Sequence, residues 1–172
     1  FESNRQIIFK NSDLEDLKIE FKDQVEDVVV RNSYYSLITH QNKYNNYQIR
    51  AVSPGHKAAE KTIIMRGRYL NEGDVFNKKK HVVIGRLVEQ DLFDGKNSVG
   101  KYITESGRSW RIVGVFQDEG GDREERTLYV PYTTRQQITN SDEIDQMIVV
   151  YDKNMSYRSS LSLENKIEKY LK

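Results

Sequence analysis

Histidine, cysteine and serine are the residues that would reveal a metal site or a nucleophile, and in this chain none of them occurs in a pattern typical of such a site. It has three histidines and no cysteine. His40, His56 and His81 have no second His, Asp or Glu at the spacing that a metal site requires. The lack of Cys excludes a thiol nucleophile, a disulfide framework and a Cys-ligated metal. No Gly-x-Ser-x-Gly elbow occurs, so the sequence favours neither a metalloenzyme nor a serine hydrolase.

An arginine directly after a glycine is the next candidate for chemistry, in the stretch IIMRGRYLNEGD that ends at Asp74. Arg68 could be an anion clamp or a partner contact. Alternatively, Gly67 adopts a backbone conformation closed to other residues, and Arg68 donates to otherwise unpaired carbonyls. Asp74 would then accept backbone N–H groups in the turn. We favour this structural interpretation.

Two charged segments could contact a ligand or a partner. The basic run ends at His81 and includes Lys78, Lys79 and Lys80, and the loop 117–126 contains Asp122 and Arg123. Both patterns are typical of solvated turns, and both are candidate partner contacts because binding residues concentrate on loops. The loop lacks the ligand spacing of an EF-hand. A net charge of +1 gives no general attraction to nucleic acid.

The elements that must position these residues follow from hydrophobic periodicity and turn signals. A helix over 11–24 places Leu14, Leu17 and Phe21 on one face, and Ser12 and Glu15 have capping-box spacing. Strands are expected at 6–10, 25–32, 34–41, 47–53, 81–85, 100–116 (a hairpin around 106–107), 127–134 and 144–153. Further helices are expected at 56–61, 86–93, 133–138 and 160–172. Gly85 is expected to be a strand-to-helix corner, because a phosphate loop needs more glycines there. The pattern predicts an α+β fold, and its aromatic content is typical of a folded domain.

Six short motifs occur in order between residues 63 and 134, and together they resemble one family. They are RGRYLNEGD (with Gly67, Arg68 and Asp74), HVVIG (ending in Gly85), DLFDG (with Phe93), SVGKYI (with Gly100), WRIVGVF (with Gly114) and LYVPYTT (with Pro131). The series is similar to the extracytoplasmic domain of MacB-type ABC transporter permeases, the class that also includes LolC/LolE and FtsX. One departure is NSVG at 97–100, where the family usually has Pro-Ile-Gly.

The resemblance implies a mixed sheet-and-helix domain with two lobes. A Porter-like lobe of βαβ units would comprise residues 1–52 and 125–172, and a smaller β-rich Sabre-like lobe would comprise 53–124. It implies that the eight motif residues above have structural roles. It also implies a periplasmic domain hung between transmembrane helices that lie outside this chain.

Three classes of function remain open at this point. The first is a non-enzymatic domain without cofactor that transmits ATP-driven motion, as the resemblance implies. Its partners would be a homodimer twin, a cytoplasmic ATPase subunit or domain, a periplasmic adaptor and an outer-membrane channel. The second is an extracytoplasmic module that binds a substrate or lipoprotein, which an apolar groove between the lobes would support. The third is a small enzyme, for which the sequence shows no convergent set of titratable groups.

Overall fold

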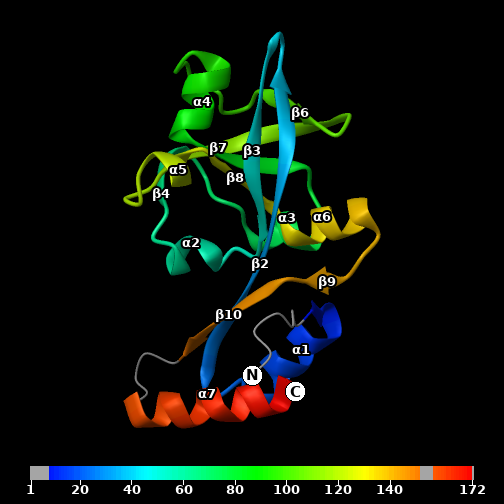
Figure 1. Ribbon diagram of the computed structural model, residues 1–172, viewed down its shortest axis with the longest axis vertical. Helices are drawn as coiled ribbons and strands as arrows, with labels where there is room; N and C mark the ends of the chain where they lie inside the picture. The colour runs from blue at the N-terminus through cyan, green and yellow to red at the C-terminus, as the bar shows by residue number, and fades with distance from the viewer. Residues whose placement is uncertain (1–7, 152–156, 172) are drawn as a thin grey trace.

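A long antiparallel hairpin forms the axis of the molecule, and the other elements pack around it (Figure 1). The structure, a computed structural model, describes residues 8–151 and 157–171. Its strands are β1 (Phe9–Lys10), β2 (Val25–His40), β3 (Lys43–Val52), β4 (Ile63–Gly67), β5 (His81–Gly85), β6 (Tyr102–Glu105), β7 (Arg108–Gln117), β8 (Thr127–Pro131), β9 (Glu143–Ile144) and β10 (Gln146–Tyr151). Its helices are α1 (Asn11–Glu20), α2 (His56–Ala59), α3 (Glu72–Phe76), α4 (Arg86–Phe93), α5 (Asp122–Glu125), α6 (Tyr132–Thr139) and α7 (Tyr157–Leu171).

Eight strands form one mixed sheet with the order β10-β2-β3-β8-β5-β7-β4, and β6 pairs with both β2 and β7. The β3–β8 and β5–β7 pairs are parallel, and the others are antiparallel. β1 and β9 form a separate two-stranded sheet. The α+β class and the mixed sheet are therefore confirmed. The lobe boundaries at residues 52 and 125 stay a prediction, because β5 of the expected Sabre-like lobe pairs with β8 of the expected Porter-like lobe within this one sheet.

Three clusters of buried side chains hold the elements together. One cluster lies between α1, the first half of β2, β9 and α7, and includes Leu14, Leu17 and Ile167. A larger one packs the hairpin against β5, α4, β6 and β7 around Trp110. The third covers the opposite side of β5, β7 and β8 around Tyr129. The predicted apolar face of the first helix is confirmed, because Leu14, Leu17 and Phe21 are all buried.

Several predicted boundaries were wrong, each for an identifiable reason. The strands expected at 25–32 and 34–41 are one strand, β2, because no turn residue interrupts them. The loop expected at 42–46 is a tight turn at Gln41–Asn42, with Gln41 at φ 54°, and β3 begins at Lys43. The first helix is capped two residues earlier than expected, at Lys10 instead of Ser12, since the Lys10 N–H donates to Asp13 Oδ2 at 2.8 Å. Residues 6 and 7 of the first predicted strand lie outside the described residues.

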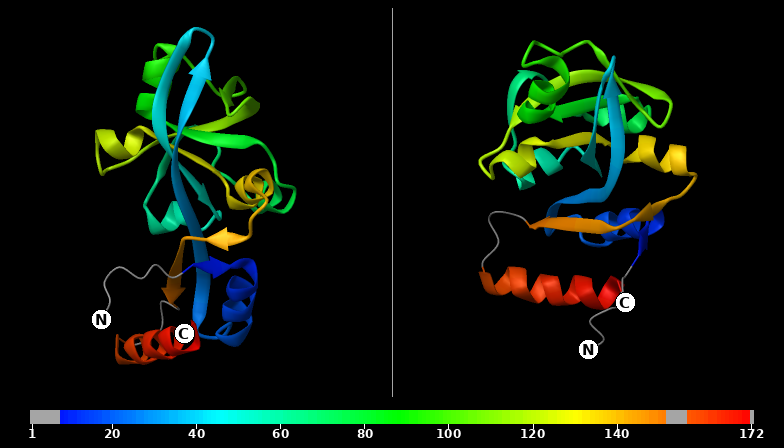
Figure 2. Two further views of the ribbon diagram at one scale, coloured as in Figure 1. Left: turned by 45° about the vertical axis from the view of Figure 1, so that its right-hand side comes forward. Right: turned by 45° about the horizontal axis from the view of Figure 1, so that its top comes forward.

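The first and last helices, α1 and α7, lie together at the end of the molecule opposite the β2–β3 turn (Figures 1 and 2). The rings of Phe21 and Tyr170 meet edge to face there, with centroids 5.7 Å apart. Among the described residues, no helix is long and apolar enough to cross a membrane. The sheet therefore extends from the end that holds α1 and α7 to a tip formed by the hairpin turn.

Candidate functional site

Two glycines allow β4 and β7 to approach closely where β4 ends. Gly67 has φ +71° and pairs with Gly114 across the sheet. A Cβ on Gly67 would overlap with the Val113 carbonyl oxygen, and a Cβ on Gly114 would overlap with the Arg68 carbonyl oxygen. The Arg68 N–H donates to the Val113 carbonyl at 2.9 Å. The glycine before the arginine thus permits a backbone approach that no other residue could make.

Arg68, Asp74 and His81 form a partly buried cluster beside this corner. The Arg68 guanidinium donates to both carboxylate oxygens of Asp74, at 2.7 and 3.2 Å, and to the Tyr69 carbonyl at 3.0 Å. His81 Nδ1 lies 2.8 Å from Asp74 Oδ1. The Asn71 N–H also donates to Asp74, at 3.0 Å. Burial alone would raise the pKa of Asp74, but these hydrogen bonds outweigh it and lower that pKa below its ordinary value.

This geometry places Arg68 and Asp74 in direct contact, which the sequence interpretation did not foresee. Arg68 donates to one carbonyl, but its main partner is the Asp74 carboxylate. The sequence offered no partner for His81, which lies seven residues after Asp74 and meets it only because α3 turns the chain back. The Asn71 side chain accepts from the Asp74 N–H at 2.9 Å and completes the reciprocal cap of α3. The cluster therefore closes the turn between β4 and β5.

A second close approach joins Gly85 to the loop 117–126. A Cβ on Gly85 would overlap with the Glu125 carbonyl oxygen. The next residue, Arg86, donates to both Glu125 carboxylate oxygens at 2.9 and 3.1 Å. The hydrogen bonds from Arg86 hold the pKa of Glu125 below its ordinary value, although burial opposes them. Gly85 is therefore the strand-to-helix corner that was expected, and it also receives a returning loop.

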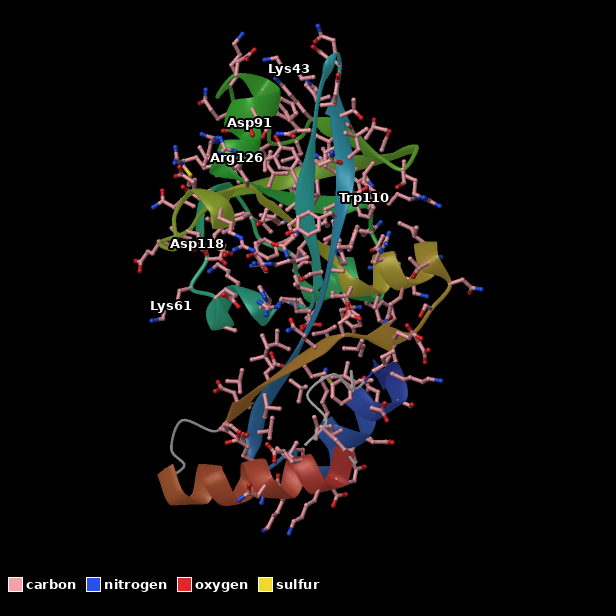
Figure 3. The ribbon with its side chains drawn as sticks, in the orientation of Figure 1. Lys43, Lys61, Asp91, Trp110, Asp118 and Arg126 are labelled. Atoms are coloured by element: carbon pink, nitrogen blue, oxygen red, sulfur yellow. The ribbon has the colours of Figure 1, made fainter. Side chains whose placement is uncertain are left out.

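The predicted partner-contact residues lie beside the middle of the molecule, not at its tip. α5, which contains Asp122 and Arg123, and α3, which precedes Lys78, are both at mid-height in Figure 1. Beside α5, Arg126 donates to Asp91 of α4 at 3.1 Å, and both are labelled in Figure 3. The Thr134 hydroxyl donates to the Lys79 carbonyl at 2.7 Å, which ties the lysine turn to α6. A role for these residues in partner binding stays a prediction.

The remaining motif residues support the fold at separate places. Phe93 is buried at the end of α4, and the centroids of its ring and the His40 ring lie 3.9 Å apart. Gly100 has φ +89° in the turn before β6. Pro131 ends β8 and precedes α6. One structural residue that sequence reasoning missed is Glu89, which is buried and accepts from both the N–H and the hydroxyl of Ser98. Its position between Val88 and Leu92, on the apolar side of α4, was the available signal.

A cleft in the described part of the chain is large enough for a small ligand. Its volume is about 420 Å³, and it lies where α1, the turn after α3 and α6 meet. Its lining consists of amide, hydroxyl and charged side chains: Asn11, Lys78, Thr133, Gln136, Gln137, Asn140, Ser141 and Asp142. This lining is polar, unlike the apolar groove that a lipoprotein-binding module would need. In the described part of the chain, no three His, Asp or Glu side chains are grouped to hold a metal ion.

Comparison with known proteins relates the chain to one group of transporters. The family model for the MacB-like periplasmic core domain matches residues 3–159. The macrolide export ATP-binding/permease protein MacB of Wolinella succinogenes is 33% identical over 73 residues, which is 40% of this chain and 11% of that protein. The protein of the same name from Campylobacter fetus is 28% identical over 116 residues, 65% of this chain and 18% of that protein. The chain thus spans less than a fifth of these two relatives.

Two solved structures share its fold. The periplasmic region of MacB from Actinobacillus actinomycetemcomitans has a TM-score of 0.85 and 23% identity, and the match covers 98% of this chain and 74% of that one. The extracellular domain of the transporter YknZ from Gram-positive bacteria has a TM-score of 0.78 and 18% identity, over 90% of this chain and 78% of that one.

Proposed function

The chain belongs to the family of MacB-like periplasmic core domains of ABC transporter permeases, and from that premise we propose that it transmits ATP-driven motion across the inner membrane. The domain is periplasmic and, by family, non-catalytic. In this proposal a cytoplasmic ATPase subunit or domain moves transmembrane helices that flank the chain. A homodimer twin moves in concert, and a periplasmic adaptor with an outer-membrane channel receives the exported substrate.

The observation that carries the proposal is the length and continuity of β2. Its 16 residues run without interruption from the end that holds α1 and α7 to the hairpin tip. A strand of that length spans about 50 Å. It pairs with β10 near its start, with β3 beyond Arg31, and with β6 near its end. Because a close-packed sheet deforms little, a displacement at the α1 and α7 end reaches the tip with little loss.

The test measures that transmission in the full-length transporter. Since the chain has no cysteine, a Cys at Gln41 is the single thiol of this domain, and in a transporter whose other cysteines are replaced it carries a spin label at each hairpin tip of the dimer. A second label pair at Ile19 of α1 reports the opposite end. We expect the distance between the twin labels to change on ATP binding at both positions. A change at Ile19 without one at Gln41 would show that the domain absorbs the motion and would refute the proposal.

Macrolide export is the activity named for the relatives, and we extend it to the parent protein of this chain as part of the proposal. The test is macrolide resistance of cells that lack their own exporter and express the full-length protein. Resistance that depends on an intact ATPase is the expected result. Unchanged susceptibility, with the protein present in the membrane, would remove macrolides from the proposal.

The polar cleft favours a second candidate function, a module that binds a polar solute. Its amide and hydroxyl lining suits a ligand with hydrogen-bonding groups better than an acyl chain. A bound solute would protect Lys78 from amine acylation, whereas Lys79 and Lys80, which do not line the cleft, serve as internal controls. Peptide mapping after acylation, with and without a macrolide, measures this protection. Equal labelling of all three lysines in both conditions would count against the cleft as a macrolide site.

A further inference from the structure

Six strands of the large sheet close into a barrel in the upper half of the molecule (Figure 1). The order β2-β3-β8-β5-β7 returns to its start because β6 pairs with both β7 and β2. Thr104 of β6 pairs with Thr39 on one side and with Ser109 on the other. Side chains alternate along each strand, so every second residue points into the barrel. The core cluster around Trp110, which is labelled in Figure 3, fills that interior.

Glu105 of β6 places a carboxylate inside this largely apolar barrel, where its side chain is buried. Its Oε2 accepts a hydrogen bond from the Ser36 hydroxyl of β2 at 2.7 Å and another from the Ser106 hydroxyl. Its Oε1 is also buried and has no hydrogen-bond partner among the described residues. A buried carboxylate oxygen without a donor lowers stability, so native proteins supply a donor from the chain or from ordered water.

Trp110 of the neighbouring strand β7 offers the complementary atom. Its indole Nε1–H is buried, and in the described part of the chain it has no acceptor. Ile103 of β6 pairs with Trp110, and Glu105 lies two residues after Ile103 on the same inner face. Glu105 and Trp110 are therefore diagonal neighbours, whose backbones lie roughly 7–8 Å apart in an antiparallel pair. Two consecutive hydrogen bonds of about 2.8 Å through one water can bridge the side chains across such a gap.

Both side chains line the same small cavity, which has a volume of about 10 Å³. A water molecule needs roughly 10–15 Å³, so the cavity has space for a single water and for no larger ligand. Its lining residues are buried except for Tyr34, which is partly buried, and the Arg135 guanidinium lies 3.7 Å from the centroid of the Tyr34 ring. The indole N–H would repel a cation and the carboxylate would repel an anion, whereas water both accepts and donates.

We propose that the barrel holds one ordered water molecule, which accepts a hydrogen bond from Trp110 Nε1–H and donates one to Glu105 Oε1. Glu105 then joins three strands where β6 closes the barrel, because its Oε2 binds Ser36 of β2 and its Oε1 reaches β7 through the water. Such a water-mediated bond is nearly as favourable in enthalpy as a direct one. The inference is independent of the proposed function, since it rests on groups inside the barrel.

The test uses NMR of the ¹⁵N-labelled chain, in which Trp110 is the only tryptophan and gives a single indole N–H resonance. Water-selective NOE and ROE spectra are recorded on this resonance. We expect a cross peak with water that has opposite signs in the two spectra, because a bound water contacts the proton without exchanging with it. The lack of a cross peak, or equal signs in both spectra as proton exchange gives, would overturn the proposal.

Variants assign the cross peak to this site. Glu105→Leu removes the acceptor and should abolish the cross peak, whereas Glu105→Gln keeps a carbonyl oxygen and should retain it. Glu89→Gln is the matched control, because Glu89 is a buried carboxylate that binds Ser98 elsewhere in the fold and should leave the cross peak unchanged. Joint replacement of Ser36 and Ser106 by alanine should also retain it, which excludes their hydroxyl protons as its source. A cross peak that persists in folded Glu105→Leu, or that is lost in the serine variant, would contradict the bridge. Dispersed amide resonances identify the folded variants, and the wild-type spectra decide the proposal if Glu105→Leu does not fold.

Discussion

Replacing Arg68 with alanine should destabilise the domain by about 2 kcal/mol at pH 7. The arginine makes two hydrogen bonds to Asp74 and one to the Tyr69 carbonyl. Loss of a partner from a buried carboxylate costs about 3–5 kcal/mol when that charge is left alone. The cost is smaller here because the Arg68 side chain is 41% exposed, so water already screens the pair. Asp74 also keeps His81 and the Asn71 N–H.

Urea unfolding of the purified chain measures this loss, with three comparison variants. Arg108→Ala is the matched control, because the side chain of that arginine makes, among the described residues, one long hydrogen bond of 3.4 Å to the Ser106 carbonyl. Its loss should lower the free energy of unfolding by less than about 0.5 kcal/mol. Arg68→Lys keeps the positive charge but cannot make the bidentate hydrogen bonds to Asp74, so the free energy of unfolding should fall by about 1 kcal/mol. A double-mutant cycle with Asp74→Asn should return a coupling of about 1–2 kcal/mol.

The pH dependence provides an independent check on the same pair. The pKa of Asp74 is lowered in the folded protein, so its stabilising effect is fully present above the unfolded pKa of about 3.9. It is lost as the pH falls through the lower folded pKa. The difference in free energy of unfolding between wild type and Arg68→Ala should therefore become smaller below about pH 4. A loss near zero at pH 7, accompanied by weaker partner binding, would refute the structural role and make Arg68 a contact residue.

Three further outcomes follow from the packing. Gly114→Ala should lower the stability of the domain by about 3 kcal/mol, because the added Cβ would overlap with the Arg68 carbonyl oxygen. Gly73→Ala in α3 is the control and should be neutral or slightly stabilising. Thermal melts compare the two variants. Burial and two nearby arginines lower the pKa of His56 to about 3, so its stabilising effect is complete above the unfolded pKa of about 6.5 and declines as the pH falls. Between pH 7 and pH 5, the free energy of unfolding of the wild type should fall by about 2 kcal/mol more than that of His56→Gln, as measured by urea unfolding. Leu17→Ala should lower the free energy of unfolding by about 2–5 kcal/mol, because Leu17 is fully buried. Ile19→Ala should change it little, because Ile19 is exposed. Similar urea midpoints for the two variants would contradict the assigned core.

Most local elements could be predicted because their signals lie within a few residues. HVVIG followed by an amphipathic run predicts β5 and α4, and Ser106-Gly107 marks the turn between β6 and β7. Gly85 was identified as a corner because a strand pattern ends and a helix pattern begins there. Even the family could be inferred from the sequence, because six motifs in fixed order carry information that no single motif carries.

The pairing of distant segments could not be obtained in this way. Nothing within β3 indicates that it lies between β2 and β8, with β8 parallel to it from far along the chain. The contact between His81 and Asp74 likewise depends on how α3 turns the chain back toward β5.

The sequence by itself determined the class of fold, the family and the positions where only glycine fits, because these depend on local conformation and on motif order. The tertiary structure alone decided which face of the β2–β3 hairpin is open. Alternation in a strand separates two sets of side chains but does not say which set meets the core. Since tyrosine and aliphatic residues occur in both sets, only the packing of the core on the Ile38 side leaves Tyr35 and Leu37 exposed to solvent.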